Sequence, residues 1–126
     1  MDNAKSVVNN PRTTGKILDE YKDSINADVR CGVAQNSNTT PETLDYMKDD
    51  KEWWVRREIA QNSNTSIETL MYIYENNYKK ECREEIIVAL SKKELYNLDE
   101  ELKDKICKIL CDIIKERRTK WKMLKK

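Results

Sequence analysis

An eight-residue segment of this chain occurs twice, and that repetition limits the architectures into which the chain can fold. Residues 33–40 (VAQNSNTT) return 26 residues later as 59–66 (IAQNSNTS), and the same step backwards reaches a more divergent copy at 7–14. A period of about 20 to 50 residues is typical of repeat proteins, in which one supersecondary unit stacks on the next. The sequence therefore predicts a stack of repeats.

Each repeat is predicted to contain two short helices joined by a turn. The segment 39–42 fits a helix start, because Thr caps free amides, Pro is tolerated in the first turn, and Thr39 and Glu42 have capping-box spacing. Apolar residues follow in helical spacing, namely Leu18, Tyr21, Leu44, Met47, Leu70 and Ile73 in the first helices, and Val29, Val33, Ala34, Val55, Ile59 and Ala60 in the second. Neither helix can bury its apolar face alone, so the core must form by stacking.

The regular period ends in the third repeat, which has one inserted residue near 76–77 and a second helix predicted over about 79–92. A long helix is predicted from Asp99, with acidic residues at its start and basic residues near its end. Terminal repeats are atypical because they cover an open apolar face. We therefore expect an all-α fold: a short right-handed α-solenoid of about three repeats over 7–91 and a C-terminal capping helix over 99–126, in a single domain 1–126.

Composition sets broad limits on compartment. Charged residues make up 37% of the 126-residue chain, whose net charge is only +1, so it is not a generally basic nucleic-acid binder. The longest apolar run, 86–90, predicts neither a membrane span nor a signal peptide. The four cysteines show no disulfide framework, and Cys107 and Cys111, one helical turn apart, are too distant for an unstrained bridge. A cytoplasmic protein with reduced thiols is expected.

Sequence features of catalysis are absent. The chain has no His, no Gly-rich phosphate loop and no nucleophile beside a recognisable base, so we expect no enzyme, no cofactor and no small-molecule substrate. Cys107 and Cys111 offer two thiolates, whereas structural zinc takes four ligands, so no metal site is predicted and both are interpreted as semi-buried packing residues. Cys82 aligns with Val55 and is expected in the core.

The repeated residues resemble a known family. The pattern consists of Val29-Arg30, Val33-Ala34, Asn36, Thr40-Pro41 and Leu44, and it resembles the leucine-rich repeat variant, a relative of HEAT-type repeats. The resemblance covers about 7–89 and implies an all-α superhelix, but no shared activity. One family member carries an iron–sulfur cluster on an N-terminal cysteine group. No cysteine precedes Cys31 here, so that cluster is not expected.

Two adjacent tryptophans are the strongest candidates for a binding site. Trp54 stands in the column where the preceding repeat has Asp28, which indicates a solvent-facing position, and Arg56 and Arg57 follow directly. Trp and Arg are enriched at binding hot spots. Trp53 and Trp54 are therefore predicted to contact a partner, with Trp54 the better candidate. The alternative is that one of them packs over the neighbouring first helix.

Two further columns recur with the repeat: Asn10, Asn36 and Asn62, and Arg30, Arg56 and Arg83. The asparagines stand where the second helix should end, and Asn tolerates the left-handed conformation, so we interpret them as structural stops that orient the next repeat. The arginines are interpreted either as buttresses between adjacent turns or as a basic strip that faces a ligand.

The C-terminal segment 115–126 holds seven basic residues and one acidic residue. Arg117, Arg118, Lys120, Trp121 and Lys122 are candidate nucleic-acid contacts there, although a solvated helix end explains them equally. We therefore expect a protein-binding scaffold, an adaptor or an inhibitor, that uses Trp53, Trp54, Arg56, Arg57, Arg30 and Arg83. The alternative is a nucleic-acid-binding HEAT-like protein that uses the arginine column, Trp54 and the basic C-terminal helix.

Overall fold

The computed structural model describes residues 3–76, 83–93 and 98–124, and in these ranges it contains helices and turns without a strand. This confirms the all-α fold class. The chain divides into two compact units, Met1–Ser91 and Lys92–Lys126. The division falls between the predicted repeats and the predicted C-terminal helix, and the single-domain organisation stays a prediction.

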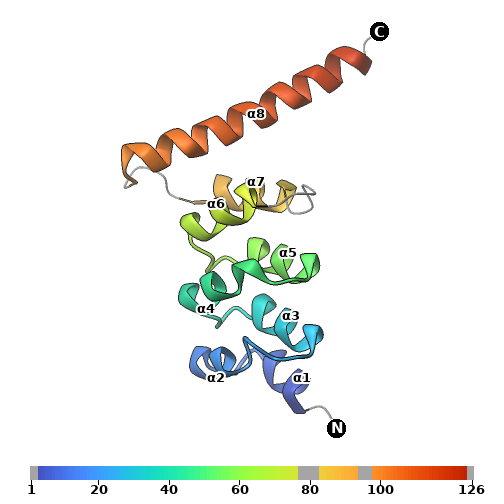
Figure 1. Cartoon of the computed structure of the whole chain (residues 1–126), viewed down its shortest axis with the longest axis vertical. Coiled ribbons are helices and arrows are strands. Elements are labelled where there is room, and N and C mark those ends of the chain that lie inside the picture. The colour runs from blue at the N-terminus through green and yellow to red at the C-terminus, as the bar shows by residue number, and fades with distance from the viewer. Residues whose placement is uncertain (1–2, 77–82, 94–97, 125–126) are drawn as a thin grey trace. The chain divides into compact units, whose positions relative to one another are not determined.

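The first unit has two layers of short helices (Figure 1). One layer contains α1 (Asn3–Val8), α3 (Ala27–Gln35), α5 (Trp53–Gln61) and α7 (Arg83–Ser91). The other contains α2 (Gly15–Glu20), α4 (Pro41–Tyr46) with the 3-10 helix η1 (Met47–Asp49), and α6 (Ile67–Glu75). Helices of the first layer pack in succession, α1 on α3, α3 on α5 and α5 on α7. The predicted start of α7 at 79–82 lies outside the described residues.

The predicted apolar positions form the core of this unit. Tyr21 is half-buried, and the other residues are buried: Leu18, Leu44, Met47, Leu70, Ile73, Val29, Val33, Ala34, Val55, Ile59 and Ala60. The second unit contains α8 (Glu100–Leu124), in which Ile106 and Ile109, three residues apart, are buried. No helix among the described residues combines the length and apolar character of a membrane span.

The asparagine column ends the helices of the first layer, as predicted, but with a different backbone. Asn36 and Asn62 follow α3 and α5 with φ of −72° and −74°, which is extended rather than left-handed. Each side-chain amide instead donates to two carbonyls of the preceding repeat. Asn62 donates to Ala34 at 2.8 Å and to Asn36 at 3.0 Å, and Asn36 makes the equivalent bonds one repeat earlier. The asparagines therefore orient successive repeats through hydrogen bonds.

The helix caps lie one residue later than the capping-box spacing predicts. Thr40 and Ser66 accept hydrogen bonds from the amides three residues on, at 3.2 and 3.1 Å. Thr39 is fully buried, and its hydroxyl donates to the Val33 carbonyl at 2.5 Å. The prediction that Thr39 caps the helix was therefore wrong, because its hydroxyl is committed to the end of the previous helix.

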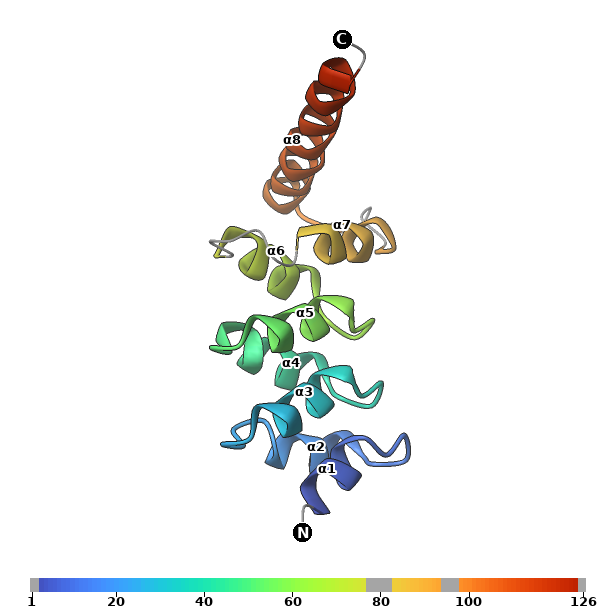
Figure 2. The ribbon, with the colours of Figure 1, turned by 90° about the vertical axis from the view of Figure 1, so that its right-hand side faces the viewer.

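The two kinds of connection emerge on opposite sides of the first unit, as Figure 2 shows. On one side are the loops 9–14, 36–40 and 62–66, which carry the asparagines and threonines. On the other side are the turns 21–26 and 47–52, which lead into α3 and α5. We call this second side the turn edge, and it is where the candidate site lies.

Candidate functional site

Trp53 opens α5 at the turn edge and is the more exposed of the two tryptophans. It is 41% exposed, whereas Trp54 is half-buried. The two rings meet edge to face, with centroids 6.2 Å apart and planes at 85°. Trp54, whose column indicates a solvent-facing position, is therefore the less exposed of the two. Comparing equivalent positions of the repeats identifies a site that is exposed when it holds Asp28. It does not show that a side chain as large as Trp54 covers itself by packing on a neighbour such as Trp53.

Arg57 lies over the face of Trp53. The guanidinium carbon is 5.2 Å from the ring centroid, which is within the range of a cation–π contact. The Arg57 side chain is 38% exposed and also lies 3.5 Å from Glu58. Arg56, the next residue of the predicted set, is half-buried and donates to the backbone carbonyl of Asp50. The structure thus brings Trp53 and Arg57 together at the surface and directs Arg56 toward the turn.

Arg30 is buried and acts as a tie between two turns. Its side chain is 8% exposed, with Nε 2.8 Å from Asp50 and Nη1 2.7 Å from the Ser24 carbonyl. The hydrogen bond to Asp50 raises the pKa of Arg30 above its ordinary value. This geometry supports the buttress interpretation and leaves Arg30 little surface for a partner. Arg83, at the start of α7, is half-buried and bonds the Tyr74 hydroxyl at 3.2 Å.

Two exposed apolar side chains on the turn edge were missed by the sequence analysis. Ile25 is 99% exposed and Tyr46 is 56% exposed. Tyr46 donates a hydrogen bond of 2.8 Å to Asp23, which raises the pKa of the phenol, and the Lys22 ammonium lies 4.4 Å from the ring centroid. The next repeat has Lys51 at the position equivalent to Ile25. The comparison of repeats that identified Trp54 as a candidate could therefore have identified Ile25 as an exposed apolar residue too.

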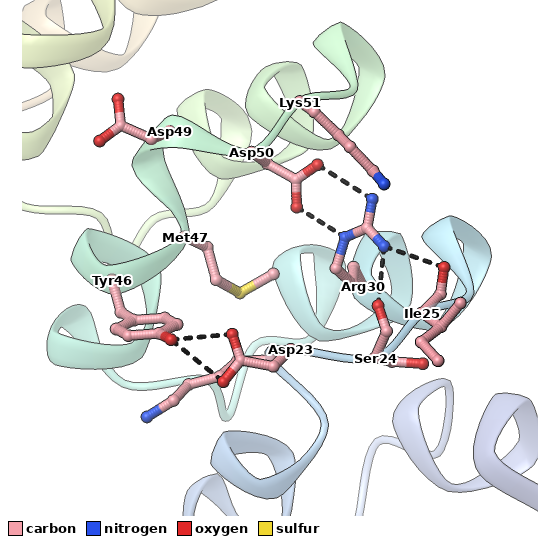
Figure 3. Close-up of a pocket in the computed structure, with 10 residues that line it drawn as sticks. Asp23, Ser24, Ile25, Arg30, Tyr46, Met47, Asp49, Asp50 and Lys51 are labelled. Carbon is pink, nitrogen blue, oxygen red and sulfur yellow. Dashed lines mark hydrogen bonds and ion pairs between the residues drawn. The ribbon is translucent and has the colours of Figure 1, made fainter.

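A shallow pocket of about 460 Å³ opens on the turn edge between these side chains. Figure 3 shows Met47 pointing between two polar pairs, Tyr46 with Asp23 and Arg30 with Asp50. The rim carries Ile25 and residues of both charges. The lining carries as many positive as negative side chains, so it has no excess of either sign, which suits part of a protein surface better than a polyanion.

The C-terminal candidates lie on α8, which extends to Leu124. The side chains of Arg117, Arg118, Lys120, Trp121 and Lys122 lie outside the described part of the structure, as does Cys82. Among the described cysteines, Cys31 is half-buried, and burial raises the pKa of its thiol. Cys107 and Cys111 are exposed, so their interpretation as semi-buried packing residues was wrong.

Comparison with known proteins adds no relative to this picture. No protein-family model matches the chain, and no curated protein or solved structure matches it. The resemblance to the leucine-rich repeat variant thus rests on the residue pattern alone, and function has to be argued from the geometry of the turn edge.

Proposed function

We propose that this chain is a non-enzymatic protein-binding scaffold, an adaptor or an inhibitor, built as a short right-handed α-solenoid of leucine-rich repeat variant type. The 26-residue recurrence supports the solenoid, because the same bonds recur at two successive junctions between repeats. Asn62 repeats the contacts of Asn36, and the Asp45 contact of Thr69 repeats the Asp19 contact of Thr43 at the same 2.7 Å. Repeats joined in this way present an extended surface to a partner. The capping role of α8 is part of the proposal.

The observation that carries the proposal is the exposure of large apolar side chains on the turn edge. Ile25 is 99% exposed, Tyr46 56% and Trp53 41%, and Arg57 covers one face of the indole. Aromatic residues and Arg dominate binding energy at protein interfaces, where charged side chains form a polar rim. Lys22, Asp23 and Lys51 line the pocket that Ile25 and Tyr46 also line, and they supply both charges for such a rim.

The opposite side of the unit is occupied by internal bonds. Asn38 donates to the Thr13 carbonyl at 2.9 Å, and Asn64 donates to the Thr39 carbonyl at 2.9 Å. The side-chain amides of Asn38 and Asn64 thus form hydrogen bonds between repeats, and this structural role is sufficient to explain why Asn occurs at both positions. On the turn edge the Tyr46 bond to Asp23 likewise recurs, as that of Tyr72 to Asp49. Ile25 and Trp53 differ, because they do not recur: the next repeat has Lys51 in place of Ile25, and the preceding repeat has Ala27 in place of Trp53.

The proposal is tested by affinity capture from native cell extract with three forms of the full chain. We expect a discrete protein that binds the natural chain and the control Val88→Ala, whose side chain is 49% exposed on α7. Binding should fall at least about 30-fold in Trp53→Ala, the cost of a hot spot of about 2 kcal/mol. The purified partner then gives these affinities directly. Equal affinities for Trp53→Ala and Val88→Ala would place the binding site elsewhere.

The nucleic-acid alternative is separated by nuclease and salt. Binding that disappears with nuclease, or that weakens steeply between about 50 and 200 mM salt, would favour it, because neutralised phosphates release counterions. The engagement of Arg30 with Asp50 and of Arg56 with the Asp50 carbonyl counts against the arginine column as a phosphate strip. Protein binding that persists under both treatments supports the scaffold.

A further inference from the structure

Two exposed cysteines lie one turn apart on α8. Cys107 and Cys111 are both exposed, in the middle of a 25-residue helix. Cysteine is among the residue types most often buried, so packing does not explain two adjacent exposed thiols. Nor does an intrahelical disulfide, because residues four apart on a helix have Cβ atoms about 5–6 Å apart, whereas a disulfide needs about 3.5–4.5 Å.

The two cysteines belong to a single ridge of the helix, which we call the thiol ridge: Lys103, Cys107, Cys111 and Lys115. Each member follows the previous one by four residues, so neighbouring side chains lie on the same face. A linear sulfur–metal–sulfur bridge spans about 4.5 Å, which is twice a metal–thiolate bond of about 2.3 Å. Two thiolates at this spacing can therefore hold one ion between them.

We infer that Cys107 and Cys111 form a two-coordinate site for a soft monovalent ion, Cu(I). Two S–H bonds break and two S–Cu bonds form, both protons pass to solvent, and copper keeps its oxidation state. The product carries one negative charge, and Lys103 and Lys115 stand one turn before and one turn after the pair in the sequence of the helix. Thiolates favour Cu(I), whereas zinc takes four ligands, of which the thiol ridge supplies two.

The test is an anaerobic titration of the full chain with Cu(I) against a chromogenic Cu(I) chelator. We expect one Cu(I) per chain, with affinity at least about 100-fold lower in Cys107→Ser or Cys111→Ser, because each variant loses the advantage of two linked ligands. The control combines Cys31→Ser with Cys82→Ser and should bind as the natural chain does. Unchanged binding in the Cys107→Ser/Cys111→Ser double variant would overturn the inference.

A second control keeps the number of thiols and changes only their geometry. Cys111→Ser with Lys108→Cys places the thiols at adjacent positions, which do not face each other on a helix. This variant should bind Cu(I) at least about 100-fold more weakly than the natural chain, and equal binding would refute the ridge geometry. Native mass spectrometry must show one chain per bound copper, since a copper-dependent dimer would mean that each cysteine pairs with another chain. Zinc bound as tightly as Cu(I) would likewise contradict the inference, because a site with two thiolates should favour Cu(I) over zinc.

Discussion

At the scale of single residues, the buried amide of Asn62 joins one repeat to the one before it. Its side chain donates to the carbonyls of Ala34 and Asn36, and its own oxygen accepts from the Asn64 amide at 2.9 Å. Asn62→Ala should lower the free energy of unfolding by about 2–3 kcal/mol, because it removes donors from buried carbonyls. Chemical denaturation measures this, with the exposed neighbour Gln61→Ala as control. Equal effects would show that the asparagine is only a helix stop.

Repetition allowed the sequence to predict which residues matter here, but not the bonds that they make. Asn36 and Asn62 were correctly placed at helix ends, since a column at a fixed period identifies a structural position. Their extended backbone and their bonds to the preceding repeat depend on a neighbour 26 residues away, which local propensity does not describe. The same limit applies to Thr39, whose hydroxyl bonds Val33 in place of capping the next helix.

At the scale of helices, α4 and α6 are joined by a hydroxyl–carboxylate bond that should make stability depend on pH. Thr69 donates to Asp45 at 2.7 Å, and this bond lowers the pKa of the carboxyl below 3.8, with further help from Lys48. Because the folded pKa is depressed, the stabilisation is present above pH 3.8 and is lost as the pH falls through the folded value. Thr69→Val keeps the shape and should raise the pKa of Asp45, which NMR titration of the carboxyl measures.

Asp19 provides the internal control for that measurement. It receives the equivalent bond from Thr43, which lowers its pKa in the same direction. Thr69→Val should leave the Asp19 titration unchanged, because the two bonds belong to different repeat pairs. An unshifted Asp45 in this variant would show that Lys48 alone depresses its pKa.

The contact between α1 and α3 depends on the absence of a side chain at Gly32. A Cβ at this position would overlap Cγ2 of the buried Val8 and lie 3.1 Å from the Asn9 amide oxygen. Gly32→Ala gains about 1 kcal/mol in helix propensity, but overpacking costs about 1–3 kcal/mol. We expect net destabilisation in thermal or chemical denaturation. Val8→Ala in the same chain should cost less than it does alone, and simple additivity of the two changes would show that the overlap is relieved without cost.

At the scale of the whole molecule, the sequence predicted the fold class better than the binding surface. The helices and the buried positions could be predicted because the apolar spacing and the 26-residue period recur along the repeats. The exposed side chains are where the repeats differ: Ile25 replaces the column of Lys51, and Trp53 replaces that of Ala27. A residue that occurs in one repeat only cannot be identified from periodicity. The exposure of its side chain also depends on how large neighbouring side chains pack, as the half-buried Trp54 shows.

The succession of helices in the first unit predicts a gradient of local stability. Within this layer, α3 packs against α1 and α5, and α5 packs against α3 and α7. Helix α1 stands at the end of the layer as the structure describes it, and its neighbour there is α3. In a stack held by nearest-neighbour contacts, an end repeat opens at lower cost than an internal one. Native-state hydrogen exchange should therefore show the slowest amide exchange in α3 and α5 and faster exchange in α1. Exchange as slow in α1 as in α5 would contradict the gradient and would show that the unit opens as one cooperative block. In that case Asn62→Ala should speed amide exchange equally in every helix of the unit. If the gradient holds, this variant should speed exchange mainly in the helices that follow the Asn62 junction.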